Sequence, residues 1–295
     1  MHVKEPLVET EPLIRTVSDT ALWTAAYRAD ETERPDALFR DPLARRLAGE
    51  RGAEIARRVK QKAVRFAVVM RTAVFDDLIT SAVTDEGFDA VVNLAAGLDA
   101  RPYRLTLPAD LLWVEADLPG IVEYKEALLT QETPRCRLER VAVDLSDAAA
   151  RRELFDDVAR RARKVLVISE GLLSYLPPEN VAALARDLAD QPVFARWLTD
   201  LTGANVVKRV RTAGHELKGG GSPALFTPEE GSAFFEPFGW IEAAWTGLFS
   251  EGPKRGRDSA LSRLVRFVSR FMSEEKRVEL DRSVGVATLI RGPRA

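Results

Sequence analysis

Apolar and polar residues recur with helical spacing along the first third of the chain. Residues 18–28 begin with a serine, a good helix N-cap, and residues 42–49 begin with a proline and end at Gly49. Residues 54–81 form a long amphipathic stretch in which arginines and lysines are interleaved with apolar residues. The pattern predicts a helical N-terminal segment, and the second of these helices should stop at Gly49.

The pattern changes at Phe88, where short apolar runs begin to alternate with helical segments. The expected strands cover 88–97, 111–117, 138–144, 165–169, 196–200, 240–247 and 285–291, and helical spacing occupies 146–164 and 178–190. Strands that alternate with helices favour an α/β fold with helices on both faces of the sheet. We therefore expect a Rossmann-like, open and mostly parallel sheet of seven strands, preceded by an N-terminal helical cap.

One domain accounts for the whole length of 295 residues. Residues 203–235 interrupt the alternation of strands and helices and include the glycine-rich run 218–223, so a mobile substrate lid is expected there. The expected parts are a helical cap at 1–85, a cofactor-binding core at 86–202, the lid at 203–235 and closing strands at 236–295.

Composition removes several classes of function. The chain has 43 Lys and Arg against 45 Asp and Glu, so it lacks the positive field that nucleic-acid binding needs, and the basic stretch 54–81 reads as surface helix. One cysteine, Cys136, and two histidines, His2 and His215, leave no disulfide framework and little for a metal site, so no metal is expected. The N-terminus is acidic without an apolar core, and no apolar run approaches the ~18 residues of a membrane helix, so a cytoplasmic location is expected.

Candidate ligand-binding residues stand at the predicted carboxyl ends of the strands, where open α/β sheets bind their ligands. Ala95 and Gly97 lie in a turn of small residues after the first strand, where a ligand can approach the backbone. Asp117 ends the second strand, 20 residues after Gly97, where an acid accepts hydrogen bonds from ribose hydroxyls. Glu115 shares its face, but Asp117 is nearer the open end. The alternatives are that the turn at 95–97 binds no ligand and that Asp117 is an ordinary solvated acid at the end of a strand.

Two further acids, Asp144 and Glu170, are expected at the ends of the third and fourth strands. Several carboxylates at one edge suit a cationic adenosine ligand such as S-adenosylmethionine and would repel a polyphosphate. The chain also lacks both the G-x-x-x-x-G-K-[ST] and the G-x-G-x-x-G fingerprints.

Several motifs resemble the leucine carboxyl methyltransferase family, in particular its bacterial branch of class I S-adenosylmethionine-dependent O-methyltransferases. The motifs are VVNLAAGLDARPYRL (91–105), WVEADLPGIVEYK (113–125), VAVDL (141–145) and ISEGLLSYLP (168–177). Residues 20–49, 70–76 and 226–240 also look like that branch, so the resemblance covers nearly the whole chain.

The resemblance implies a class I methyltransferase fold and a set of residues that bind S-adenosylmethionine. Arg71 would meet the methionine carboxylate, Gly97 would lie under the cofactor, Asp117 would bind the ribose, Asp144 and Leu145 would lie beside the adenine, and Glu170 would lie near the ammonium. The family turn commonly reads Gly-x-Gly, whereas this chain has Ala95-Ala96-Gly97, which is expected to lower cofactor affinity or reshape the turn.

The residues that would bind the methyl acceptor are less well defined by the sequence. Tyr175 is a candidate for lining it, with a structural tyrosine as the alternative, and His215 is a candidate general base, with an exposed loop histidine as the alternative. The resemblance implies a carboxylate or hydroxyl acceptor on a small molecule, such as a polyketide-type secondary metabolite. An NAD(P)-dependent oxidoreductase and a non-catalytic scaffold on the same fold are the competing hypotheses. The oligomeric state does not follow from the sequence.

Overall fold

Every strand expected from the sequence is present in a computed structural model of the protein, which describes residues 17–59, 61–203, 206, 225–257 and 272–292. The strands are β1 (Ala90–Leu94), β2 (Leu112–Asp117), β3 (Arg137–Ala142), β4 (Val165–Ser169), β5 (Phe194–Thr202), β6 (Trp240–Gly247) and β7 (Val284–Arg291). They form one sheet in the order β3-β2-β1-β4-β5-β7-β6. β1 to β5 are parallel, and β7 runs antiparallel to both of its neighbours, β5 and β6. The sheet is therefore mostly parallel, as predicted.

The strand order reverses between β1 and β4, which are neighbours in the sheet although β2 and β3 separate them in sequence. This reversal is the place where doubly wound sheets open a crevice for ligands, outside the carboxyl ends of the strands. Both β1 and β4 are buried along their whole length, which explains why they are apolar except for Asn93 and Ser169. The topology thus directs attention to the segments that follow β1 and β4.

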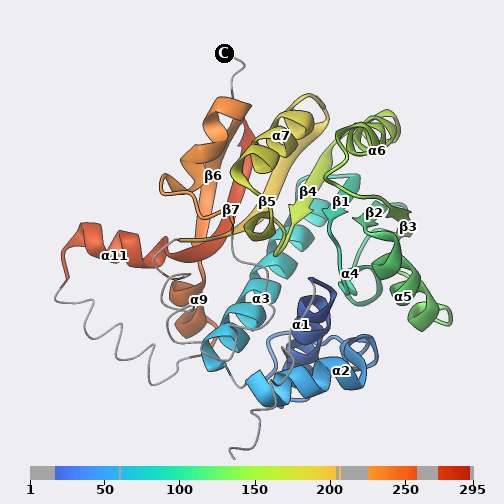
Figure 1. The fold of residues 1–295 in the computed structure, drawn as a ribbon, viewed down its shortest axis with the longest axis vertical. Helices are drawn as coiled ribbons and strands as arrows, with labels where there is room; N and C mark the ends of the chain where they lie inside the picture. Colours follow the sequence, from blue (N-terminus) through green and yellow to red (C-terminus); the bar gives the residue numbers. More distant parts are fainter. Residues whose placement is uncertain (1–16, 60, 204–205, 207–224, 258–271, 293–295) are drawn as a thin grey trace, which may run out of the picture.

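Helices cover both faces of the sheet (Figure 1). On one face, α6 (Ala148–Arg161) and α7 (Pro178–Ala189) bury Phe155 and Leu184 against the strands, together with Phe226 and Phe235. On the other face, α3 (Lys62–Asp85) contributes a second apolar cluster that includes Met70, Phe75 and Ile79. This arrangement confirms the expected α/β layering.

The N-terminal helices α1 (Val17–Thr32) and α2 (Ala44–Val59) pack on each other beside the turn that follows β1. Gly49 does interrupt α2, with φ 57° and ψ −171°, but a second helical segment resumes directly and continues to Val59. The predicted stop at Gly49 is therefore a kink. The long amphipathic stretch is divided between the end of α2 and α3.

Some elements differ from the sequence-based expectation. Helix α5 (Pro119–Leu129) and the short α4 (Arg101–Arg104) were not predicted. Strand β3 ends at Ala142, so Asp144 lies two residues beyond the strand rather than at its end. Helix α6 is capped by the Asp147 carboxylate, which accepts hydrogen bonds from two backbone amides, and not by Ser146.

The last part of the expected lid, from 225 to 235, packs on the core through two buried phenylalanines. Phe226 and Phe235 are 4% and 0% exposed, and Phe235 lies in the 3-10 helix η3 (Gly231–Phe238), which packs on α7 and β6. His215 and the glycine-rich run 218–223 lie outside the described residues. The remaining elements are the 3-10 turn η1 (Leu173–Tyr175) and the helices α9 (Leu248–Lys254) and α11 (Glu274–Asp281). None of the helices that the structure describes has the length and apolar character needed to cross a membrane.

Candidate functional site

The turn after β1 is held in an unusual conformation by the carboxylate at the end of β2. Ala95 and Gly97 both have φ of 51°, in the left-handed region that favours glycine. The Gly97 amide donates to Asp117 Oδ2 over 2.6 Å, and the Leu118 amide donates to Asp117 Oδ1 over 2.7 Å. Gly97 and Asp117, which the sequence predicts separately as cofactor-binding residues, are thus in direct contact, and Ala95 carries the strain of a side chain in a glycine-type conformation.

Asp117 retains capacity for further donors. An ionised carboxylate offers about four lone-pair positions, and the two backbone amides occupy two of them. Asp117 is partly buried, and this burial raises the pKa of its carboxyl group above the usual value. A ligand that donates hydroxyl hydrogens here would stabilise the ionised form.

Helix α1 lies directly over this turn. A Cβ built on Gly97 would lie 3.7 Å from the Ala21 side chain of α1. Arg28, also on α1, donates to the Leu98 carbonyl over 2.6 Å and pairs with the buried Asp41 over 3.0 Å. The cap helix is therefore fixed to the segment that follows β1, and only a small residue fits beneath it at position 97.

Arg71 and Glu170, which the resemblance assigns to the methionine end of the cofactor, are in contact. Arg71 Nε donates to Glu170 Oε1 over 3.0 Å, joining α3 to the residue that follows β4. The other oxygen, Oε2, lies 2.7 Å from Nη1 of Arg101. Burial by itself would raise the pKa of Glu170, but the charges of Arg101 and Arg71 hold it below the usual value.

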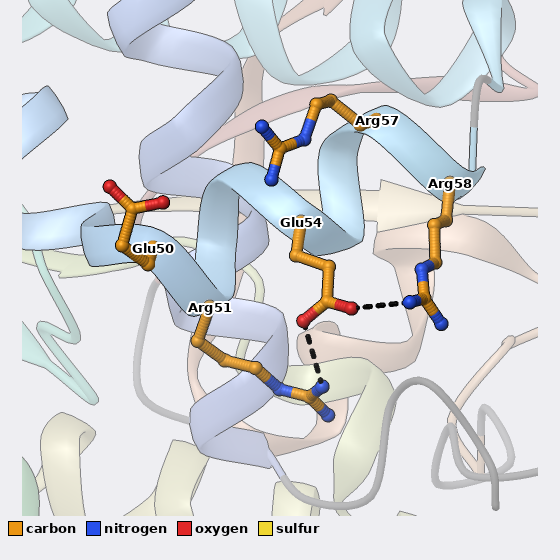
Figure 2. A pocket seen from close by; sticks show the side chains of 5 residues that line it. All are labelled: Glu50, Arg51, Glu54, Arg57 and Arg58. Atoms are coloured by element: carbon orange, nitrogen blue, oxygen red, sulfur yellow. Dashed lines mark ion pairs between the residues drawn. The ribbon is translucent and has the colours of Figure 1, made fainter.

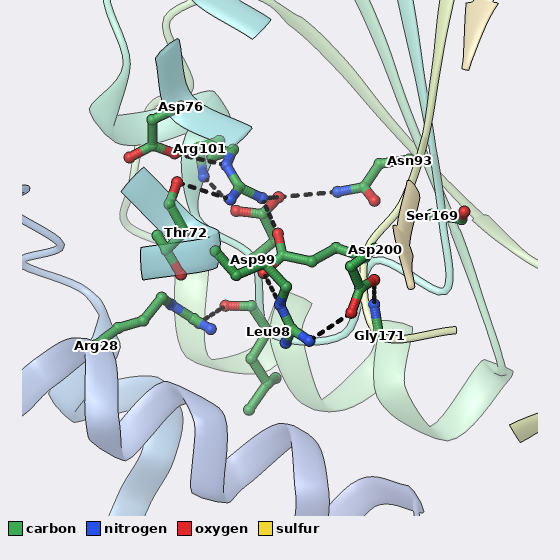
Figure 3. A network of polar contacts seen from close by, with 12 residues as sticks. Arg28, Thr72, Asp76, Asn93, Leu98, Asp99, Arg101, Ser169, Gly171 and Asp200 are labelled. Atoms are coloured by element: carbon green, nitrogen blue, oxygen red, sulfur yellow. Dashed lines mark hydrogen bonds and ion pairs between the residues drawn. The ribbon is translucent and has the colours of Figure 1, made fainter. Parts of the chain in front are cut away.

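A network of buried charges surrounds this pair (Figure 3). Arg101, with its side chain 3% exposed, binds Asp76 over 2.7 Å and Asp99 over 2.9 Å, and Asn93 donates to Asp99 over 2.9 Å. Arg71 also binds Asp200 over 2.8 Å. None of these ion-pair partners was predicted from the sequence. For Asp200 the available signal was the one used for Asp117, an acid near the carboxyl end of a strand.

Acids outnumber bases in the described part of this network. Its carboxylates are Asp41, Asp76, Asp99, Glu170 and Asp200, and its guanidinium groups are Arg28, Arg71, Arg101 and Arg104. The excess of one negative charge in a buried setting favours a cationic ligand nearby.

Asp144 and Leu145 lie in the loop between β3 and α6. Asp144 is exposed, and hydrogen bonds from the side chain of Ser146 and from its backbone amide, the latter over 2.8 Å, lower the pKa of its carboxyl group. The Leu145 carbonyl accepts from Arg151 over 2.6 Å, and Arg151 in turn pairs with Asp187 on α7. The loop is therefore anchored from two helices, at the same end of the sheet as Asp117.

The remaining candidates have less defined positions in the site. Tyr175 is half-buried at the end of η1, five residues after Glu170. Cys136 is 7% exposed, and burial, together with the charge of Glu115, raises the pKa of its thiol to about 12. It is therefore protonated at neutral pH and a poor nucleophile.

A surface hollow along α2 lies apart from the strand ends (Figure 2). Its lining residues all belong to that helix, where Glu54 is shared between Arg51 and Arg58. Side chains there are substantially exposed, and exposed ion pairs of this kind contribute little to stability or specificity. The hollow is a feature of the cap surface and has no residue in common with the site above.

Known proteins that resemble this chain in sequence are methyltransferases by name. Residues 21–189 match the model of the family described as Leucine carboxyl methyltransferase. A relative from Streptomyces avermitilis, named "Putative S-adenosyl-L-methionine-dependent methyltransferase", is 35% identical over 75% of this chain and 80% of its own length. A relative of the same type from Streptomyces coelicolor is 39% identical over 58% of this chain, and the match spans 64% of that relative.

Solved structures agree on the fold. A "putative methyltransferase" from Thermobifida fusca has a TM-score of 0.57 at 15% identity, covering 96% of each chain. A duf574 family protein from Streptomyces avermitilis has a TM-score of 0.56 at 16% identity, covering 92% of this chain and 97% of its own.

Proposed function

The chain belongs to the leucine carboxyl methyltransferase family, and on that premise we propose that it transfers a methyl group from S-adenosylmethionine to an oxygen atom of a small molecule. The observation that carries the proposal is the contact of Asp117 with the Gly97 amide at the end of β2, on the same edge of the sheet as the Arg71–Glu170 pair. These are the two ends of a site for an adenosine ligand with a charged tail.

The chemistry of the donors and acceptors fits this cofactor. Asp117 has acceptor positions for the ribose hydroxyls, and Gly97 provides a surface without a side chain beneath them. Glu170 would bind the ammonium group, and Arg71 keeps N–H groups for the carboxylate beyond those used in its two ion pairs. Asp144 and Leu145 would border the adenine.

When bound, S-adenosylmethionine supplies an electrophilic methyl group on a sulfonium, which an acceptor oxygen takes by in-line displacement. The protein's part is to hold the two reactants in line and exclude water, which can contribute ~7–11 kcal/mol in well-oriented cases. The α1 helix, fixed over the 95–99 turn by Arg28, would exclude solvent from one side. Tyr175 would line the acceptor side.

We favour a carboxylate acceptor over a hydroxyl. A carboxylate has a reference pKa near ~4 and is already a nucleophile at neutral pH, so it needs no general base. A phenol or alcohol would need one, and His215 would then be the candidate. Replacing a working general base typically costs about 10²–10⁴ in rate, so His215→Ala should slow carboxylate methylation by less than roughly tenfold.

The test begins with binding. Calorimetry should detect S-adenosylhomocysteine but not NADH; the opposite result would revive the oxidoreductase hypothesis. Radiolabelled S-adenosylmethionine is then offered to a panel of small carboxylic acids, phenols and alcohols, with release of methanol in mild base as the readout for a methyl ester. Transfer to phenols alone, with a large loss in His215→Ala, would move the assignment to hydroxyl methylation. Cofactor binding with no transfer to any acceptor would favour a non-catalytic scaffold.

A further inference from the structure

Asp200 lies on β5, a strand on which no site residue was predicted. β5 is parallel to β4, and the register pairs Ser169 with Thr199, so Asp200 and Glu170 each follow a paired position. The side chain of Asp200 is 14% exposed, compared with 16% for Glu170. The fold thus places a second partly buried acid beside Glu170.

The carboxylate of Asp200 joins two segments that border the cofactor site. Its Oδ2 accepts from Arg71 Nη1 over 2.8 Å, and its Oδ1 accepts from the Gly171 amide over 2.6 Å. Arg71 belongs to α3, whereas Gly171 directly follows Glu170. One side chain therefore fixes the guanidinium relative to the turn that carries Glu170.

Gly171 shows how closely these two parts meet. Its φ of 70° is in the left-handed region, and a Cβ built on it would lie 3.5 Å from Nη2 of Arg71. Without the Asp200 carboxylate, the Gly171 amide would lose a charged acceptor and Arg71 would keep Glu170 as its main partner. Arg71 would then be free to turn toward Glu170 and cancel more of its charge.

Building on the proposed function, we propose that Asp200 is a positioning residue for the amino-acid end of the cofactor, acting through Arg71 and Gly171. By sharing Arg71 between two carboxylates, it keeps negative charge on Glu170 for an ammonium group and holds the remaining Arg71 N–H groups toward a carboxylate. It contributes nothing to the adenosine end, which Asp117 and the 95–97 turn would bind.

Two ligands separate this role from a general structural one. S-adenosylhomocysteine carries the amino-acid tail, and 5′-methylthioadenosine lacks it but keeps the adenosine. The variant is Asp200→Asn, which removes the charge and changes little in volume, and the matched control is Asp110→Asn, on an exposed acid in the loop before β2. Affinities are measured by calorimetry on the full chain.

Asp200→Asn should weaken S-adenosylhomocysteine binding about tenfold or more and change 5′-methylthioadenosine binding by less than about threefold, with both affinities unchanged in the control. In an Arg71→Met background Asp200→Asn should weaken S-adenosylhomocysteine binding much less, because Asp200 has already lost Arg71, the residue through which it acts. Equal losses for the two ligands, no loss for either, or the same cost in both backgrounds would overturn the inference. Failure of the unaltered protein to bind S-adenosylhomocysteine would instead contradict the proposed function.

Discussion

Replacement of Asp117 by asparagine tests the adenosine end of the site most directly. The two carboxylate oxygens each accept one backbone amide, from Gly97 and from Leu118. Asparagine has a single oxygen, so its NH₂ group must face one of these amides and leave it without an acceptor. The Leu118 amide is exposed and can bind water, so the NH₂ group should face it, and the free protein should lose less than the ~1–3 kcal/mol of a buried unpaired donor.

The cofactor loses a further contribution, because its ribose hydroxyls would donate to a neutral group instead of a carboxylate. Hydrogen bonds to charged groups are worth about 1.5–3 kcal/mol, so S-adenosylhomocysteine should bind about 10- to 150-fold more weakly to Asp117→Asn. Calorimetry gives the affinity and urea unfolding the stability. Asp110→Asn, on the exposed loop before the same strand, is the control and should change neither. Unchanged affinity in a folded Asp117→Asn variant would refute the ribose assignment.

Three further predictions follow from individual contacts. Ala95 has a left-handed conformation that costs about 1–2 kcal/mol for an alanine, and glycine would relieve it at ~0.5–1 kcal/mol of backbone entropy. Ala95→Gly should therefore raise the Tm. The control Ala96→Gly, at a position without positive φ, should lower it. A fall in Tm for Ala95→Gly would contradict the assigned strain. Lys125→Met removes one of the two cations that pair with the buried Glu115, at 2.8 Å, while Arg140 remains at 2.9 Å. The variant should therefore lose about 1.5–3 kcal/mol in urea unfolding, less than an unpaired buried charge would cost, and Glu115→Gln should restore part of it in the double variant. Lastly, burial raises the pKa of Asp117, and hydroxyl donors prefer its ionised form, so S-adenosylhomocysteine affinity should fall as the pH drops through that pKa. Calorimetry at decreasing pH, from neutral toward the ordinary carboxyl pKa near ~4, should show this fall, and Asp117→Asn should abolish it.

The arrangement of strands and helices was accessible from the sequence because burial leaves a periodic record. The mainly apolar runs of β1 and β4 predicted strands that are covered on both faces, and the structure places them in the middle of the sheet. Asp117 was also predictable, because ligands bind at the carboxyl ends of parallel strands. Its prediction needs only the end of the second strand and the spacing to Gly97 along the chain. Helix α5 was not predicted, although Pro119 stands in its first turn, a position that proline favours.

The charge network around Glu170 was decided by the tertiary structure alone. Arg71, Arg101 and Asp200 come from α3, α4 and β5, and no periodicity in a single sequence relates three such positions. By composition Arg71 is one arginine among many on an amphipathic helix; the family resemblance singled it out, but its ion-pair partners are visible only in the structure. The sequence determined which segments are buried because apolar transfer depends on local composition. Which buried charges meet depends on how those segments pack, since an ion pair is stabilised only by the distance and the desolvation that packing creates.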